Sequence, residues 1–223
     1  MRLALAGNHE LCRNKIKVIL PHALDFRMST KEILVARHGE TQWNRLRKWQ
    51  GSSDIPLNET GLNQARQLGM SLTGEGIGRI YSSDLQRALT TARIVSEIVQ
   101  TGNVTTDSRL RERGLGKFEG WKSVEVARFL GMPDEQARIL ETDELSIENG
   151  PDVEPWESFT KRVWSFLEDA AVAKEHGKIL VVAHGGVMRA ISYTLTHEGF
   201  GMPEYSNGQY IRLKVKENSW EID

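Results

Sequence analysis

The sequence predicts an α/β fold: a three-layer α/β/α sandwich around a mainly parallel sheet, with one antiparallel edge strand. From Lys31 onward, short apolar runs alternate with stretches whose apolar residues recur at helical spacing, which is typical of a parallel sheet covered on both faces. The last apolar segment, residues 210–215, alternates apolar and polar residues and predicts a strand at the sheet edge. The length of 223 residues suits one such domain.

The first half of the chain predicts two helices between three strands. Residues 33–36 form a continuously apolar run, as a buried strand does. Asn58 is placed to cap a helix that runs to about Ser71, because its side chain can accept a hydrogen bond from a free N–H group of the first turn. Ser83 is placed to cap the next helix in the same way. The expected segments are strands at 33–36, 79–82 and 104–106, and helices at 58–71 and 83–98.

The second half predicts an insertion, two helices and two strands. Residues 121–150 look like a polar insertion with short helices around 124–130 and 135–140. Pro155 favours a helix start, because proline needs no N–H partner in a first turn. The expected segments after it are a helix at 156–174, a strand at 178–183, a helix at 187–195 and the strand at 210–215.

The first 28 residues differ from the rest. They carry five basic residues against two acidic ones, and their apolar segments are short and interrupted. We expect residues 1–28 to be a poorly ordered N-terminal extension; a start site at Met28 and a transit peptide are the alternatives. Residues 29–223 then form the functional domain, with a lid insertion at about 113–155.

Composition excludes several classes of function. The net charge of −1 gives no general attraction for nucleic acid or an anionic membrane, and no apolar run approaches the roughly 18 residues of a membrane span. Cys12 is the only cysteine, which excludes an intrachain disulfide or a cysteine-rich metal site and fits a cytoplasmic protein. We expect no nucleic-acid partner and no membrane partner.

Charged and polar residues follow three of the expected strands where each strand ends. Arg37 and His38 follow the first strand, with Asn44 a few residues on, and His184 follows the strand at 178–183. Arg87 lies one turn into the helix after the second strand. Because the carboxyl ends of parallel strands meet at one edge of a sheet, these residues are expected to converge, and together they fit a phosphate group.

Each residue type has a physical reason to be there. Arginine offers a planar fork of N–H donors to phosphate oxygens, and a helix start offers free backbone N–H groups. Gly39, Gly185 and Gly186 let the backbone approach a bound group closely. One histidine, if neutral, can attack phosphorus, and the other, if protonated, can donate to the phosphoryl oxygens. This much positive charge requires no metal, and we expect no metal and no cofactor.

A phosphatase also needs a proton for its leaving alcohol. Glu112 follows the weak strand at 104–106 and is the best placed by the same strand-end argument. Glu40 and Glu119 are the alternatives, although Glu40 fits an exposed first turn and Glu119 fits the lid.

Five segments resemble the histidine phosphatase superfamily, in its phosphoglycerate mutase-like branch. The resemblance extends from Lys31 to the last strand, and Pro155-Trp156 stand where the family commonly has two glycines. The segments are RHGETQWN, YSSDLQRALTTA, LRERGLGKFEGW, VVAHGGVMRAI and PWESFTKRV.

The resemblance implies a phosphoglycerate mutase-like fold and a set of residue roles. His38 would be the phosphorylated nucleophile, and Glu112 the proton donor. The phosphoryl group would be bound by Arg37, Asn44, Arg87, His184 and Gly185, and Gln50 and Gly51 would line the mouth of the site.

Mutases and phosphatases of the family share this pocket, so the length of the insertion has to distinguish the two functions. Glu112 and His184 are 72 positions apart (184 − 112), which resembles the shorter insertion of the phosphatases. The sequence therefore favours a histidine acid phosphatase-type phosphoric monoester hydrolase acting on a small phosphorylated metabolite. The alternatives are a phosphoglycerate mutase and an inactive phospho-ligand-binding scaffold. Some residues of the insertion could contact the substrate or form a solvated face: Lys117, Trp121, Lys122, Arg128 and Arg138. The chain could be a monomer, or a homodimer through Trp49, Phe200 or the last strand.

Overall fold

The computed structural model describes residues 31–137, 140, 147, 150–173, 176–196, 204–216 and 219–223. These residues form a six-stranded sheet in the order β3-β2-β4-β1-β5-β6. Strands β1, β2, β3 and β4 are mutually parallel, β5 runs antiparallel to β1, and β6 runs antiparallel to β5. The strands are β1 (Lys31–Arg37), β2 (Ile77–Ser82), β3 (Val104–Thr106), β4 (Lys178–Ala183), β5 (Tyr210–Lys216) and β6 (Ser219–Ile222).

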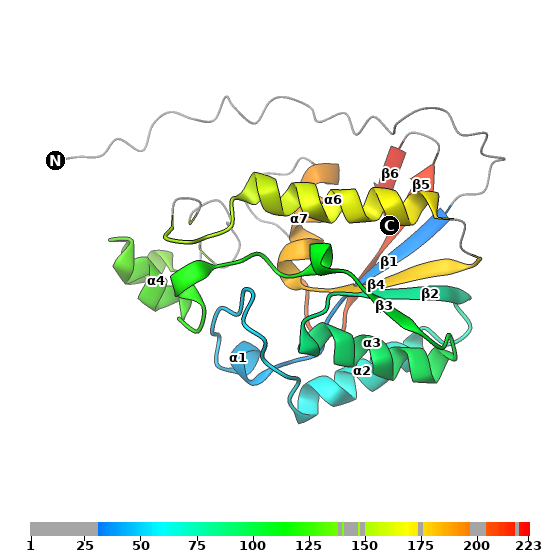
Figure 1. Ribbon diagram of the computed structural model, residues 1–223. Coiled ribbons are helices and arrows are strands. Elements are labelled where there is room, and N and C mark those ends of the chain that lie inside the picture. Colours follow the sequence, from blue (N-terminus) through cyan, green and yellow to red (C-terminus); the bar gives the residue numbers. More distant parts are fainter. Residues whose placement is uncertain are drawn as a thin grey trace.

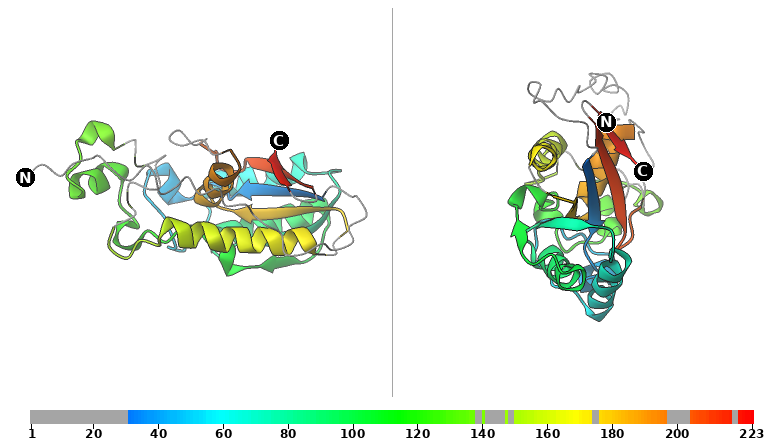
Figure 2. Two further views of the ribbon diagram at one scale, coloured as in Figure 1. Left: turned by 90° about the horizontal axis from the view of Figure 1, so that it is seen from above. Right: turned by 90° about the vertical axis from the view of Figure 1, so that its right-hand side faces the viewer.

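Helices cover both faces of the sheet and confirm the predicted sandwich (Figures 1 and 2). Ile33 and Val35 of β1 pack under α6 and α7, whereas Leu34 and Ala36 pack under α2 and α3, because successive strand side chains point to opposite faces. The α-helices are α1 (Gln42–Arg45), α2 (Glu59–Ser71), α3 (Gln86–Val99), α4 (Ser123–Phe129), α6 (Trp156–Val172) and α7 (Gly185–Thr196).

The sheet edge differs from the prediction. The strand expected at the edge, β5, lies between β1 and β6, and the edge itself is β6, which the sequence did not predict. A four-residue strand is too short to show an alternating pattern in the sequence. Packing against a neighbouring helix stabilises it instead. The Trp220 ring of β6 packs edge-on against Trp164 of α6, with centroids 5.3 Å apart.

Two helix starts also differ from the prediction. Asn58 caps α2 as expected, since its Oδ1 accepts from the Gly61 N–H at 2.8 Å. Ser83 does not cap α3: the helix starts at Gln86, and the Ser83 hydroxyl accepts from the Leu85 N–H within the preceding turn. Helix α7 starts at Gly185 rather than at residue 187, so it follows His184 directly.

The insertion has a small apolar core, so the expectation of a polar segment is wrong. Phe118, Val126 and Ala127 are fully buried, and they form a cluster with Ala137, Leu140, Ile147 and Val153 that is separate from the two sheet clusters. The first predicted short helix is α4, while a 3-10 turn at Asp134–Gln136 lies at the start of the second, and residues 138 and 139 of that second helix are outside the described residues. Helix α4 lies past the end of the sheet where the parallel strands finish, as α1 does (Figure 1).

Several predictions fall on residues that the structure does not describe. These are the N-terminal extension with Cys12, and the side chains of Arg138 and Phe200. Trp49, an interface candidate in the sequence, packs against the insertion, and its indole N–H donates to the Ser123 hydroxyl at 3.2 Å.

Candidate active site

The His38 ring lies at the carboxyl end of β1, where it is buried. Its backbone N–H donates to the Ala183 carbonyl of β4, which fixes the backbone after β1. The ring Nδ1 is 2.6 Å from the Gly39 carbonyl oxygen. A carbonyl only accepts, so Nδ1 carries the proton and Nε2 carries the lone pair. The structure thus places at this strand end a histidine whose Nε2 has no hydrogen-bond partner among the described residues.

His184 meets His38 from the neighbouring strand, as predicted. The two ring centroids are 5.2 Å apart with an interplanar angle of 62°. His184 is fully buried, and neither of its ring nitrogens has a hydrogen-bond partner among the described residues. Buried polar atoms are nearly always paired, so this ring fits a site that binds a polar group.

Arg87 is fully buried and Arg37 is half-buried, and both lie beside the histidines. Arg87 donates from Nη1 to the Ser53 carbonyl at 2.6 Å and from Nη2 to the Gly51 carbonyl at 2.8 Å. Arg37 donates from Nη1 to the Tyr205 carbonyl at 2.5 Å. In each arginine the Nε–H is buried and has no partner within the described part of the chain. Both guanidinium groups are held by main-chain oxygens and keep a donor for an anion.

Burial and positive neighbours determine the protonation states here. Desolvation first, and then the charges of Arg87 and Arg37, lower the pKa of His38 well below its ordinary value. Desolvation and Arg87 lower the pKa of His184 in the same direction. Burial, with a smaller effect of Arg189, lowers the pKa of Arg37 to about 10, so it stays charged at neutral pH. The expected protonated form of a second histidine is therefore disfavoured, and both imidazoles are neutral.

Glu112 contacts the first turn of α7, and its charge acts on Arg37 and Arg87. Its Oε2 accepts from the Gly186 N–H at 3.0 Å, in the first turn of α7, and its Oε1 accepts from the Arg113 N–H at 2.9 Å. A Cβ atom at Gly186 would lie 2.1 Å from Glu112 Oε1, so a glycine is required for this approach. The carboxylate therefore lies at the N-terminus of α7, the helix that directly follows His184.

The two alternative carboxylates have structural partners elsewhere. Glu119 accepts from the Ser52 N–H at 2.8 Å and from the Ser53 hydroxyl at 2.5 Å. Glu40 accepts from the Asn58 side-chain amide at 2.7 Å, at the start of α2. Of the three candidates in the sequence, Glu112 is the one that contacts the first turn of α7, which follows His184.

The remaining predicted residues build the loop that supports Arg87. Asn44 Oδ1 accepts from the Thr41 N–H at 3.0 Å and closes the turn after β1. Gln50 is buried and accepts from the Thr41 hydroxyl at 2.9 Å. Gly51 has a φ of 51°, and its carbonyl accepts from Arg87. These contacts place Gln50 and Gly51 behind Arg87 within the supporting loop.

Three residues at the site were not predicted. A Cβ atom at Gly185 would lie 3.2 Å from Arg189 Nη1 and 3.5 Å from Arg37 Nε, so Gly185 sits between two guanidinium groups. The Asn207 side-chain amide donates to the His38 carbonyl at 2.9 Å, and the Tyr205 carbonyl accepts from Arg37. Helical spacing from Gly185 could have indicated Arg189, but residues 205–207 lie in an irregular loop with no pattern.

The basic residues of the insertion have partners of their own. Lys117 Nζ lies 3.4 Å from the centre of the Phe129 ring, and Arg128 pairs with Asp134 at 2.5 Å on an exposed surface. This favours the solvated-face interpretation for Arg128. Among the described residues, no three His, Cys, Asp or Glu side chains gather as metal ligands would.

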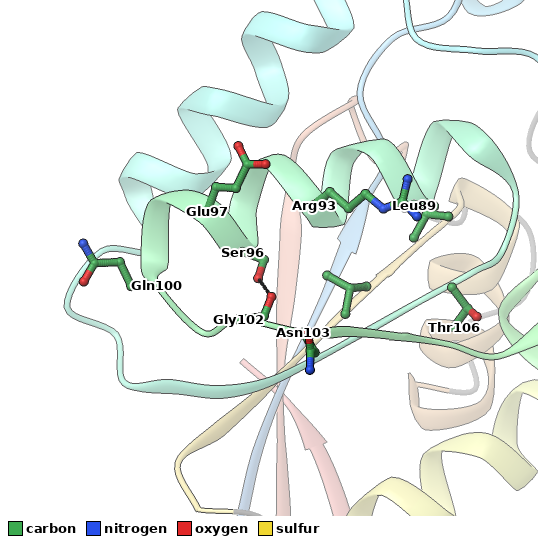
Figure 3. A pocket seen from close by; sticks show the side chains of 9 residues that line it. Leu89, Arg93, Ser96, Glu97, Gln100, Gly102, Asn103 and Thr106 are labelled. Atoms are coloured by element: carbon green, nitrogen blue, oxygen red, sulfur yellow. Dashed lines mark hydrogen bonds between the residues drawn. The ribbon is translucent and has the colours of Figure 1, made fainter.

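A hollow in the surface lies away from these residues, between α3 and the edge strand β3 (Figure 3). Arg93, Glu97 and Asn103 are on its rim, and the Ser96 hydroxyl donates to the Gly102 carbonyl at 2.6 Å. None of the residues that line it is a predicted site residue. The predicted residues instead gather at the carboxyl end of the strands.

Comparison with known proteins identifies the family. The family model of the histidine phosphatase superfamily (branch 1) matches residues 33–223. The chain belongs to this superfamily. The match includes every predicted site residue, from Arg37 to Gly185.

Relatives in the superfamily include both mutase-like proteins and phosphatases. Phosphoglycerate mutase-like protein 4 of Arabidopsis thaliana is 35% identical over 161 residues, which cover 72% of this chain and 69% of that protein. The uncharacterized phosphatase PhoE of Bacillus subtilis is 32% identical over 195 residues, which cover 85% of this chain and 91% of that protein. The chain is therefore a superfamily enzyme of phosphatase or mutase-like type.

Solved structures show the same fold. The phosphoglycerate mutase of Bacillus anthracis aligns with a TM-score of 0.76 at 25% identity, over 87% of this chain and 92% of that one. A mycobacterial glucosyl-3-phosphoglycerate phosphatase aligns with a TM-score of 0.73 at 26% identity, over 86% of this chain and 97% of that one. Separately, no helix in the described residues is both long and apolar enough to cross a bilayer.

Proposed function

We propose that this superfamily member is a metal-independent phosphomonoesterase that hydrolyses a small phosphorylated metabolite through a phosphohistidine. The observation that carries the proposal is the neutral His38, whose Nε2 carries a lone pair and whose pKa is lowered by burial and by the neighbouring Arg87 and Arg37. A neutral imidazole is a nucleophile, whereas an imidazolium is not.

The proposed reaction has two steps. His38 Nε2 attacks phosphorus, the bond from phosphorus to the ester oxygen breaks, and the protonated carboxyl group of Glu112 gives its proton to the leaving alcohol. In the second step the Glu112 carboxylate takes a proton from water, the water oxygen attacks phosphorus, and phosphate leaves His38. Arg37 and Arg87 bind the phosphoryl oxygens through both steps, and the neutral His184 donates through one ring N–H.

The choice of phosphatase over mutase rests on the insertion and on two relatives. The 72 positions between Glu112 and His184 match the shorter insertion implied by the resemblance, and the relatives include PhoE and the glucosyl-3-phosphoglycerate phosphatase. A phosphoglycerate mutase is the second candidate, favoured by the mutase-like relative. It predicts interconversion of 2- and 3-phosphoglycerate.

The test measures phosphate release from a panel of small phosphomonoesters in the presence of EDTA. We expect turnover in the wild type that is indifferent to the chelator, and a loss of about 10³-fold or more in His38→Ala. His176→Ala, an exposed histidine, is the matched control and should keep full activity. Phosphate release by His38→Ala at a rate near wild type would show the mechanism to be wrong, and phosphoglycerate interconversion without hydrolysis would identify a mutase.

A further inference from the structure

The segment that carries Glu112 has no regular structure of its own. It lies between two 3-10 turns, at Ser108–Leu110 and Gly116–Phe118. No strand ladder or helix therefore pairs the main-chain groups of residues 111–115, although these groups lie at the edge of the site. Main-chain carbonyls outside a helix or sheet need hydrogen-bond donors from side chains or from other segments, and here a side chain of α6 is the donor.

Arg162 of α6 supplies those donors. Its Nη1 donates to the main-chain carbonyls of Arg109 and Arg111, each at 2.7 Å, and its Nη2 donates to the carbonyl of Glu112 at 3.0 Å. Its Nε and Nη2 donate to the two carboxylate oxygens of Glu154 at 2.7 and 2.8 Å. All five N–H groups of this guanidinium thus have an acceptor: two of these acceptors are carbonyls of residues 111–115, and a third is the Arg109 carbonyl just before them.

Glu154 holds the other side of the segment. Its Oε2 accepts from the Gly114 N–H at 3.0 Å, and its main-chain N–H donates to the Gly114 carbonyl at 2.8 Å. Its own carbonyl accepts from Arg113 Nε at 2.7 Å. Burial alone would raise the pKa of Glu154, but hydrogen bonds from Arg162 and Gly114 outweigh it and lower the pKa. The carboxylate that orients Arg162 is therefore itself held in one position.

We propose that Arg162 and Glu154 are positioning residues for the proton donor, and that they set where the Glu112 carboxyl group meets the leaving oxygen. This inference rests on the proposed function. The pair holds the backbone on both sides of Glu112, while the Gly186 N–H holds the carboxylate itself. Lysine cannot replace Arg162, because its ammonium group has three donors and no planar fork.

Substrates with different leaving groups can distinguish a role in positioning the proton donor from a general structural role. An alkyl phosphate has a poor leaving group and depends on the proton from Glu112, whereas p-nitrophenyl phosphate leaves readily without it. A misplaced proton donor therefore lowers kcat/KM for the alkyl ester much more than for the aryl ester. A loosened fold lowers both alike.

The experiment measures kcat/KM for an alkyl phosphate and for p-nitrophenyl phosphate in wild type, Arg162→Lys and Glu154→Gln. We expect Arg162→Lys to lose about 10- to 100-fold on the alkyl ester and less than about 3-fold on the aryl ester. Glu112→Gln should show the same selectivity, and the double variant of Arg162→Lys with Glu112→Gln should lose little more than Glu112→Gln alone. Arg109→Lys is the control, because the Arg109 side chain pairs with Asp107 and Asp169 and not with the Glu112 segment.

Other outcomes overturn the proposal. Equal losses on both esters in Arg162→Lys and Glu154→Gln, no loss on either, or loss of the folded state in both variants would leave the pair a structural role only. Failure of the proposed function gives a different result: either the wild type hydrolyses neither ester, or His38→Ala hydrolyses both.

Discussion

At the scale of single residues, the site depends on a buried positive charge whose hydrogen-bond acceptors are not carboxylates. Arg87 is fully buried, yet the oxygens that accept from it are main-chain carbonyls rather than carboxylates. Its charge therefore acts on the nearby imidazoles, and burial acts in the same direction. A histidine in this place can be a nucleophile at neutral pH because burial first, and then the two arginine charges, keep it unprotonated.

This arrangement predicts a dependence of stability on pH. The pKa values of His38 and His184 are lowered in the folded state, so between those values and about 6.5 only the unfolded chain binds the protons. The free energy of unfolding should therefore fall as the pH drops below about 6.5, by up to about 1.4 kcal/mol per pH unit for each histidine. Urea unfolding at pH 7.5, 6.5 and 5.5 measures this slope. A variant with His38→Gln and His184→Gln should lose most of it and His176→Gln should keep it; an unchanged slope in the double variant would contradict the assignment.

At the scale of elements, helix starts rather than helix interiors shape the site. Helix α7 starts at Gly185, and the Gly186 N–H of its first turn binds the Glu112 carboxylate. Helix α2 starts beside the loop that follows His38, because Asn58 contacts both its own first turn and Glu40. The turn after β1 and the start of α2 are thus joined by one side chain.

Removing this cap should destabilise the protein. Asn58→Ala loses the bond to the Gly61 N–H and the bond to Glu40, and we expect a loss of about 1–2 kcal/mol in the free energy of unfolding. Asn63→Ala, an exposed asparagine of the same helix, is the matched control and should change it by less than about 0.5 kcal/mol. Urea denaturation of the two variants measures the difference. Equal values would show that the cap contributes nothing to folding.

At the scale of the whole molecule, the buried apolar residues that the structure describes divide into three clusters. Two cover the opposite faces of the sheet, and the third lies within the insertion around Phe118. The Phe118 ring is fully buried and contacts the rings of Trp49, Trp121 and Phe129, with centroids 5.7 to 6.4 Å apart. The insertion therefore has a core that can loosen without opening the sheet.

This division predicts a local effect of Phe118→Ala. The lost ring should destabilise the insertion by about 3–5 kcal/mol, while β1 and β4 keep their packing. Hydrogen exchange measured by mass spectrometry should show faster exchange at residues 115–137 and unchanged protection at 31–37 and 178–183. Phe159→Ala, which removes a buried ring from a sheet cluster, is the control and should weaken protection in the strands. Faster exchange in the strands of Phe118→Ala would contradict the division.

Local signals were enough to predict most of the elements and the group of residues at the strand ends. A buried parallel strand is a short apolar run whatever lies around it, so 33–36 and 178–183 could be recognised from sequence. The parallel order of these strands then brings His38 and His184 together without further information. The strand β6 and the missing Ser83 cap were not predictable in this way, because packing against α6 and the geometry of one turn decided them.

By itself, then, the sequence determined the α/β sandwich and the set of histidines and arginines at one end of it, because periodicity and strand-end position are local properties. The tertiary structure decided which glutamate contacts the first turn of α7, how Arg162 and Glu154 hold its backbone, and that both histidines are uncharged. These depend on contacts between residues 50 and 74 positions apart and on the exclusion of water from the histidine rings, and neither has a signature in a short stretch of chain.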